Sequence, residues 1–261
     1  MDLNSLGMFG DSFNVLTSLF TGLAFAGVVI SVILQTKELE EARTEFRGQK
    51  EALIDQQKEM KIQSFDNKFF QMLNLFNNNI NSLIINSNRE TYKGRDLFVY
   101  LKFNLEKKIE SRYLLSNKNS FEIVDFHCFI DSFKEFNNDN DTTFKYYFLN
   151  LYQIINYIDK DIPNKEYAKK YMNILRAQLS KSELILLCYN AIGVIEFSGD
   201  KYKKLIEKYS FFEHLQYEDF GENFNIIRIN DILLSKYSNE AYGKNIQLID
   251  KINTRRNLNE L

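Results

Sequence analysis

The segment from Ser12 to Thr36 constrains this chain most, because its 25 residues contain no ionisable side chain. As an α-helix it would be roughly 37 Å long, which is enough to cross a hydrocarbon layer of about 30 Å. A secretory signal peptide is the main alternative, since Ala24-Phe25-Ala26 imitates a small-x-small cleavage site. However, no Lys or Arg precedes the segment, and the apolar run from Val28 to Leu34 continues past that site. The sequence therefore favours a membrane span over a signal peptide or a buried core helix.

The charges around this segment predict its orientation. No basic side chain precedes it, whereas four follow it closely: Lys37, Arg43, Arg47 and Lys50. Since the basic flank of a span stays in the cytoplasm, we expect a single-pass protein with its N-terminus outside and its C-terminal domain in the cytosol. The two cysteines, Cys128 and Cys188, stand among apolar residues, which is typical of reduced core residues in such a domain.

The rest of the chain favours an all-α fold, because 261 residues contain one proline, Pro163, and only ten glycines. We expect a transmembrane anchor at residues 1–36, a helical stalk at 37–63, a cytosolic multi-helix domain at 64–250 and a frayed tail at 251–261. The formal net charge of −2 predicts no general attraction to nucleic acid.

Two patterns in the anchor and stalk predict self-association. Apolar residues recur every seven positions after Val32, at Leu39, Phe46, Leu53 and Met60. The companion positions are small or polar, so a solvated single helix and a parallel coiled-coil stalk both remain open. Small residues that let membrane helices pack closely recur every four positions in the span, at Ser18, Gly22 and Ala26. Together the patterns favour a homo-oligomer.

Several helices of the cytosolic domain can be placed from periodicity. A wide apolar face from Phe65 to Ile84 predicts a helix that enters the core, and a second helix should run from about Arg95-Asp96 to Leu115. Further helices are expected at 124–136, 143–158, 167–179 and 201–209. Residues 137–141 carry side-chain oxygens that could serve as calcium ligands, but the segment lacks the central glycine and the terminal glutamate of a calcium-binding loop. We therefore expect a solvated connection there.

The clearest local signal is Ser180-Lys181-Ser182-Glu183, which has the form of a capping box. The helix that it starts, Leu184 to Ile192, is apolar on nearly every face and should lie at the centre of the core, ending at Gly193. The segment 221–234 is ambiguous, because residues 225–229 would also suit a short strand.

No catalytic motif is present. The chain has no Gly-rich phosphate loop, no Gly-x-Ser-x-Gly elbow and no His-Glu-x-x-His run. Its histidines and cysteines do not have zinc-site spacing. We therefore expect neither a metal nor a cofactor, and enzymatic activity is disfavoured but left open. Basic side chains at 201, 203, 204 and 208 could touch an anionic membrane surface, although nearby acids weaken that interpretation.

Several of these stretches together resemble the putative phage abortive infection proteins, an AbiC-like family of bacterial antiviral proteins. The similarity lies in ordered blocks between residue 15 and about residue 215. The first three blocks are the apolar span with Leu39-Glu40-Glu41-Ala42-Arg43, the run from Phe65 to Leu75, and Gly94 to Phe98. The others are Tyr147 to Tyr152 with Tyr157-Ile158-Asp159; Ile174 to Ser180 with Glu183 and Tyr189-Asn190-Ala191; and Leu205 to Ser210.

The resemblance implies a role in bacterial defence, in which an infected cell stops growing or dies before phage can mature. It implies the bacterial inner membrane as the location, and it supplies no catalytic residue. Within the matched blocks the polar side chains to test for function are Arg95, Asp96, Arg176, Gln178, Glu183, Tyr189 and Asn190.

Our leading hypothesis is a non-enzymatic, membrane-anchored defence protein that senses an unknown phage or host trigger and then perturbs the membrane or halts growth. The alternatives are a membrane-tethered enzyme or nucleic-acid-binding effector, with Arg95, Asp96, Arg176 and Glu183 in one pocket, and a scaffold that docks another defence protein.

Overall fold

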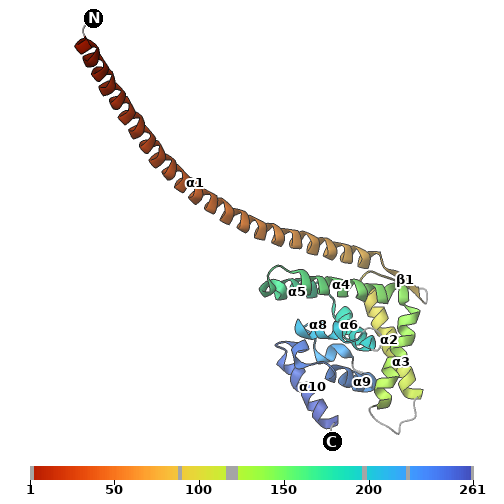
Figure 1. Ribbon diagram of the computed structural model, residues 1–261. Coiled ribbons are helices and arrows are strands. Elements are labelled where there is room, and N and C mark those ends of the chain that lie inside the picture. The colour runs from red at the N-terminus through yellow and green to blue at the C-terminus, as the bar shows by residue number, and fades with distance from the viewer. Residues whose placement is uncertain (1–2, 88–89, 116–122, 196–198, 222–223, 260–261) are drawn as a thin grey trace. The chain divides into compact units, whose positions relative to one another are not determined.

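The computed structural model describes residues 3–87, 90–115, 123–195, 199–221 and 224–259, and it confirms an all-α fold (Figure 1). A long first helix is followed by one β-hairpin and a set of shorter helices. In chain order the elements are α1 (Leu3–Ser82), β1 (Ile84–Ser87), β2 (Glu90–Lys93), α2 (Asp96–Leu115), α3 (Ile123–Asp139), a π-helix η1 (Asp141–Lys145), α4 (Tyr146–Asp161), a 3-10 turn η2 (Lys165–Tyr167), α5 (Ala168–Arg176), α6 (Lys181–Gly193), α8 (Lys201–Lys208), η3 (Tyr217–Phe220), α9 (Phe224–Ser235), η4 (Asn239–Tyr242) and α10 (Ile246–Asn259).

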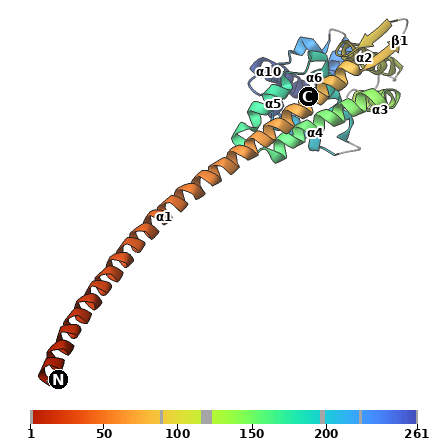
Figure 2. The ribbon, with the colours of Figure 1, turned by 90° about the horizontal axis from the view of Figure 1, so that it is seen from above.

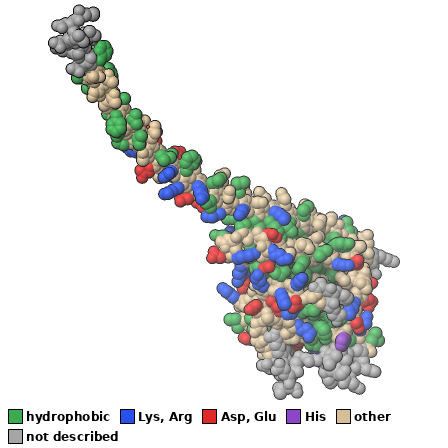
Figure 3. Space-filling model, viewed as in Figure 1, with side chains coloured by type: hydrophobic (Ala, Val, Ile, Leu, Met, Phe, Trp, Pro, Cys, Tyr) green, Lys and Arg blue, Asp and Glu red, His purple; other side chains and the backbone are tan. Residues whose placement is uncertain are grey.

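The chain divides into two compact units, residues 1–61 and 62–261. In the first unit the helix is long and apolar enough to cross a membrane, and none of its most apolar stretch is buried. Figure 3 shows green and tan atoms along the described start of this helix, with charged side chains appearing only further along it. The seven-residue column is also exposed, and Phe46, for example, keeps 69% of its surface.

The second unit begins with the last part of α1, whose apolar face is buried as the periodicity predicts. Phe65 stacks on Tyr157 of α4 with 4.9 Å between ring centroids, and Phe76 lies 5.1 Å from Tyr147 of the same helix. Figure 2 shows this part of α1 running beside α4. Ring contacts between large aromatic side chains therefore hold the two helices together.

A β-hairpin, which the sequence analysis missed, follows α1. Strands β1 and β2 pair antiparallel, with Ile84 opposite Lys93 and Ile85 opposite Tyr92. The chain then turns into α2 at Gly94, whose φ of +55° suits glycine and whose amide donates to the Leu83 carbonyl at 3.0 Å. The strands have only four residues each, which is too short for an alternating pattern to stand out.

The solvated connection expected at residues 137–141 is also largely helical. Helix α3 continues to Asp139, and the Asn140 side chain donates to the Phe136 carbonyl at 2.9 Å. The π-helix that follows places Phe144 fully inside the core, with its ring 5.0 Å from Phe136 and 4.8 Å from Phe148. Burial of this ring outweighs the polar composition of the segment.

Helix α6 occupies the centre of the second unit, as expected. Its capping box is present, because the Glu183 amide is bonded to the Ser180 hydroxyl and the Ser180 amide to the Glu183 carboxylate. The helix ends at Gly193, as expected. Gly193 does not have a positive φ, and a Cβ there would lie 2.3 Å from the Phe133 ring. Close packing against α3 explains this glycine.

The C-terminal part resolves one ambiguity and corrects one expectation. Residues 224–235 form helix α9, so the strand considered at 225–229 is not present. Helix α10 continues to Asn259, so residues 251–259 are helical where a frayed tail was expected, since Leu248 and Ile252 pack into the core. Residues 260 and 261 lie outside the described residues. Cys128 and Cys188 are both buried and unpaired, as predicted.

Candidate functional site

A pocket of about 890 Å³ in the second unit is the best candidate for a binding site, because its volume lies in the range of small-molecule sites. We call it the aromatic pocket. Side chains from α3, η1, α4, α6 and α8 line it: Phe133, Lys134, Asn137, Asn138, Lys145, Phe148, Leu149, Tyr152, Asn190, Val194, Lys201 and Tyr202.

One part of the lining is apolar and rigid. Phe133 and Phe148 are buried in the main core and contact the π-helix through the Phe144 ring. Tyr152 meets Tyr202 edge to face, with 5.2 Å between ring centroids. These rings come from α3, α4 and α8, so the packing of the domain fixes the shape of the pocket.

Two polar side chains stand in the wall of the pocket. Asn190 keeps only 4% of its surface exposed, and it lines the pocket. The Tyr202 hydroxyl is enclosed and has no hydrogen-bond partner among the described residues. Buried polar groups are nearly always hydrogen-bonded, so this wall is suited to a polar molecule in the pocket.

The charged residues among the described lining are lysines, namely Lys134, Lys145 and Lys201. Lys145 forms an ion pair with Asp141 at 2.9 Å, and this hydrogen bond raises the pKa of the Lys145 ammonium. Asp200, next to Lys201 in sequence, is paired instead with Lys204 at 2.7 Å. The charged side chains of the described lining are therefore all basic.

The predicted site residues Arg95 and Glu183 meet in a second, buried cluster. Arg95 Nη1 lies 2.5 Å from Glu183 Oε2, and Arg95 Nη2 donates to Asn77 Oδ1 at 3.1 Å. The Tyr147 hydroxyl donates to Glu183 Oε1 at 2.7 Å. Burial raises the pKa of the Tyr147 phenol, and the Glu183 carboxylate raises it further. These contacts join α1, the start of α2, α4 and α6.

Arg176 belongs to a different cluster. It is 7% exposed, pairs with Glu213 at 3.1 Å, donates to the Ser210 carbonyl at 2.6 Å and lies 3.2 Å from His214 Nε2. Burial alone would raise the pKa of Glu213, but the hydrogen bond and charge of Arg176 outweigh it and lower the pKa. The contacts of Arg176 are those of a structural arginine.

Tyr189 forms a third buried cluster, in which its hydroxyl lies 2.8 Å from Asn230 Oδ1 and 3.2 Å from Glu106 Oε1. Burial raises the pKa of Glu106, although Lys102 opposes that shift. Of the remaining predicted positions, Asp96 is exposed in the first turn of α2 and Gln178 is half-buried after α5. Among all seven, only Asn190 lines the aromatic pocket.

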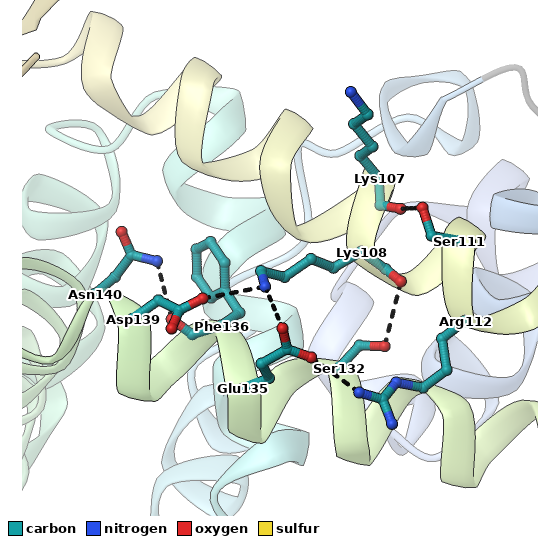
Figure 4. A network of polar contacts seen from close by, with 9 residues as sticks. All are labelled: Lys107, Lys108, Ser111, Arg112, Ser132, Glu135, Phe136, Asp139 and Asn140. Carbon is teal, nitrogen blue, oxygen red and sulfur yellow. Dashed lines mark hydrogen bonds and ion pairs between the residues drawn. The ribbon is translucent and has the colours of Figure 1, made fainter. Parts of the chain in front are cut away.

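A groove of about 970 Å³ between α2 and α3 is another large depression, and Figure 4 shows its polar network. Lys108 binds Glu135 at 2.6 Å and Asp139 at 3.0 Å, while Arg112 binds Glu135 at 2.9 Å. The hydrogen bond from Lys108 is the largest influence that lowers the pKa of Glu135. Because these charges neutralise one another across the two helices, the network is better suited to holding α2 on α3 than to binding a ligand.

Sequence reasoning missed most of the aromatic pocket. Its lining is spread from Phe133 to Tyr202 over five elements, and no spacing in the sequence connects Lys134, Lys145 and Lys201. The expectation of no metal site concerned His127, His214, Cys128 and Cys188. The described residues contain no group of three or more His, Cys, Asp or Glu side chains that could hold a metal ion.

The fold and the site define a helical domain with an aromatic, lysine-rimmed pocket, in a chain whose first helix has the composition of a membrane span. The sequence model of a family described as "Putative phage abortive infection protein" matches residues 139–220, which confirms the resemblance over that segment. The segment holds eight of the twelve pocket residues, together with Tyr147, Arg176 and Glu183. No curated protein and no solved structure matches the chain.

Proposed function

We propose that this protein is a membrane-anchored abortive-infection protein that acts at the inner membrane of a bacterial cell. The single observation that carries the proposal is the family match at residues 139–220, in the same chain as an exposed apolar helix long enough to cross a membrane. The helical domain senses a phage or host trigger, and the anchor then perturbs the membrane or halts growth there.

The polar groups of the apolar helix support a position in lipid. The hydroxyls of Thr17, Thr21 and Thr36 each donate to the carbonyl four residues back, at 2.7–2.8 Å. The Gln35 amide donates to the Ser31 hydroxyl at 3.2 Å. Since a bilayer offers no water to bind polar groups, bonding within the helix lowers the cost of placing these side chains in hydrocarbon.

The proposal includes self-association. Leu39, Phe46, Leu53 and Met60 each keep more than half of their surface exposed in the single chain. A parallel stalk would bury this column. Substituting Phe46 and Leu53 by Lys should lower the oligomer size of the detergent-solubilised chain in light scattering, whereas Lys at Thr44 and Glu51, on the opposite face of the helix, should not. A monomeric unmodified chain would contradict this part.

The test of the function is phage plating on cells that make the full chain, residues 37–261 alone, or neither, with accumulation of both chains checked. We expect the full chain to reduce plaque formation and residues 37–261 to give little or no reduction. Absence of protection by the full chain against a broad phage panel would contradict a defence role. Equal protection by both chains would contradict the need for an anchor.

The hypothesis that the protein damages the membrane is tested by measuring the membrane potential of infected cells that are protected. We expect the potential to fall before lysis in cells that make the full chain. Protection with an unchanged potential would leave growth arrest as the mechanism. The lysine face of α8 gives little support to membrane contact, because Lys203, Lys204 and Lys208 pair with Glu207, Asp200 and Asp159.

A further inference from the structure

We propose that the aromatic pocket binds a nucleotide-class ligand, which is a small molecule with a flat heteroaromatic ring and a phosphate group. This inference rests on the pocket itself and not on the defence role, because binding can be measured in purified protein. Three features of the pocket support it: the polar groups of the wall, the flat aromatic surfaces and the basic side chains of the lining.

The Asn190 amide selects against a purely apolar occupant. Asn190 is only 4% exposed, and an alkyl chain against it would exclude water from its amide and offer it no hydrogen bond, which is unfavourable. A heteroaromatic ring carries donors and acceptors on its edge, and a side-chain amide can pair with both kinds at once. Asn137 and Asn138 add two further amides to the lining.

The aromatic side chains offer faces and edges for a flat ring. Phe133, Phe148, Tyr152 and Tyr202 all line the pocket, and the first two are held in the main core. Stacking of a nucleobase on an aromatic side chain tolerates any base, because every base has a π-face. The pocket can therefore hold a base without a base-specific motif in the sequence.

The lysines favour a negatively charged group at the mouth. Lys134, Lys145 and Lys201 line the pocket, and the described lining contains no carboxylate. Asp141 neutralises part of the charge of Lys145, whereas no ion pair involves Lys201 among the described residues. A lysine ammonium binds phosphate as a point charge, with no need for a fixed orientation.

The test is isothermal titration calorimetry of the full chain in detergent with ATP, GTP, CTP and UTP in separate titrations. We expect saturable binding of at least one nucleotide. Inorganic phosphate tests the contribution of the lysines alone, and octanoate tests that of the apolar lining. Each should bind at least tenfold more weakly than the best nucleotide.

Two variants test the site, and one matched variant controls for charge. Lys201→Gln and Asn190→Leu should each weaken nucleotide binding roughly tenfold, as loss of one contact predicts. Lys204→Gln removes the same charge from the same helix but does not line the pocket, so it should bind as the unmodified chain does. Near-UV circular dichroism checks that Asn190→Leu is folded; if it is not, Lys201→Gln decides.

The proposal is overturned if none of the four nucleotides binds at about 1 mM. It is also overturned if Lys201→Gln binds as tightly as Lys204→Gln, because binding would then lie elsewhere. Tighter binding of octanoate than of any nucleotide would assign the pocket to apolar anions instead.

Discussion

At the residue scale, Glu183 links local and tertiary structure, because its carboxylate has partners in its own helix cap and in two other parts of the chain. Its carboxylate is completely buried, yet it receives hydrogen bonds from the Ser180 amide, the Tyr147 hydroxyl and the Arg95 guanidinium. A buried charge is tolerable only when its oxygens are satisfied in this way. The same side chain thus caps α6 and fixes that helix against α4 and the start of α2.

Arg95→Ala should destabilise the domain by about 3 kcal/mol, since it leaves the buried Glu183 carboxylate without its ion-pair partner. The matched control is Arg112→Ala on the surface of α2, where Arg112 pairs with the exposed Glu135. That change should cost less than about 1 kcal/mol. Thermal unfolding of the full chain, followed by near-UV circular dichroism of its tyrosines, compares the two. Equal losses would contradict the role assigned to Glu183.

Glu213→Gln should remove part of the acid sensitivity of the fold. The pKa of Glu213 is lower in the folded chain than its ordinary value near 4.5, so the pair with Arg176 stabilises the fold above that pH. This contribution is lost as pH falls through the folded pKa. The variant should therefore be less stable than the unmodified chain by roughly 2 kcal/mol at pH 7, and the difference should narrow below pH 4.5.

The control for this prediction is Glu240→Gln, which changes an exposed glutamate. Its stability should follow that of the unmodified chain at every pH. A stability difference for Glu213→Gln that is as large at acid pH as at pH 7 would show that the effect is not electrostatic.

At the scale of elements, α6 packs closely against α3 because Gly193 has no side chain. Gly193→Ala would place a Cβ 2.3 Å from the Phe133 ring, which also lines the aromatic pocket. We expect a loss of about 1–3 kcal/mol from overpacking and weaker binding in the pocket. Gly48→Ala, in open space on α1, is the control and should cost nothing. A stable Gly193→Ala variant would contradict the packing explanation.

The elements show which features a single sequence can predict. Local signals were sufficient for the capping box at Ser180, the apolar face of α1 from Phe65 to Ile80 and the first residue of α2. The π-helix was not predictable, because it depends on Phe144 entering a core built from α3 and α4. The end of α10 likewise depends on burial of Ile252 by other parts of the chain.

The candidate sites were harder to predict than the elements, since their contacts join residues far apart in sequence. Arg95 and Glu183 are 88 positions apart, and Tyr147 and Glu183 are 36 apart. Sequence analysis grouped Arg95 and Glu183 only in one alternative hypothesis, which also placed Arg176 beside them, whereas Arg176 pairs with Glu213 in a different cluster. The sequence analysis placed Lys201 and Tyr202 in a helix with many charged residues and did not predict that they line a pocket. Only the fold shows which face of α8 lines it.

At the scale of the whole molecule, the two units of the chain have different surfaces. Residues 13–36 of the first unit carry exposed apolar side chains and no charge. The visible face of the second unit has basic and acidic side chains intermixed (Figure 3). That contrast is typical of an anchored protein with a water-exposed domain.

The most direct test of this account is alkaline extraction of membranes from cells that make the full chain. We predict that the unmodified chain stays in the membrane pellet, as expected if the segment from Ser12 to Thr36 spans the bilayer as proposed. Lysine at both Phe25 and Val29 should release the chain, since each charge at the centre of a span costs about 3 kcal/mol. Lysine at both Leu53 and Gln57, at the same spacing in the stalk, should not. Recovery of the unmodified chain in the soluble fraction would contradict the account.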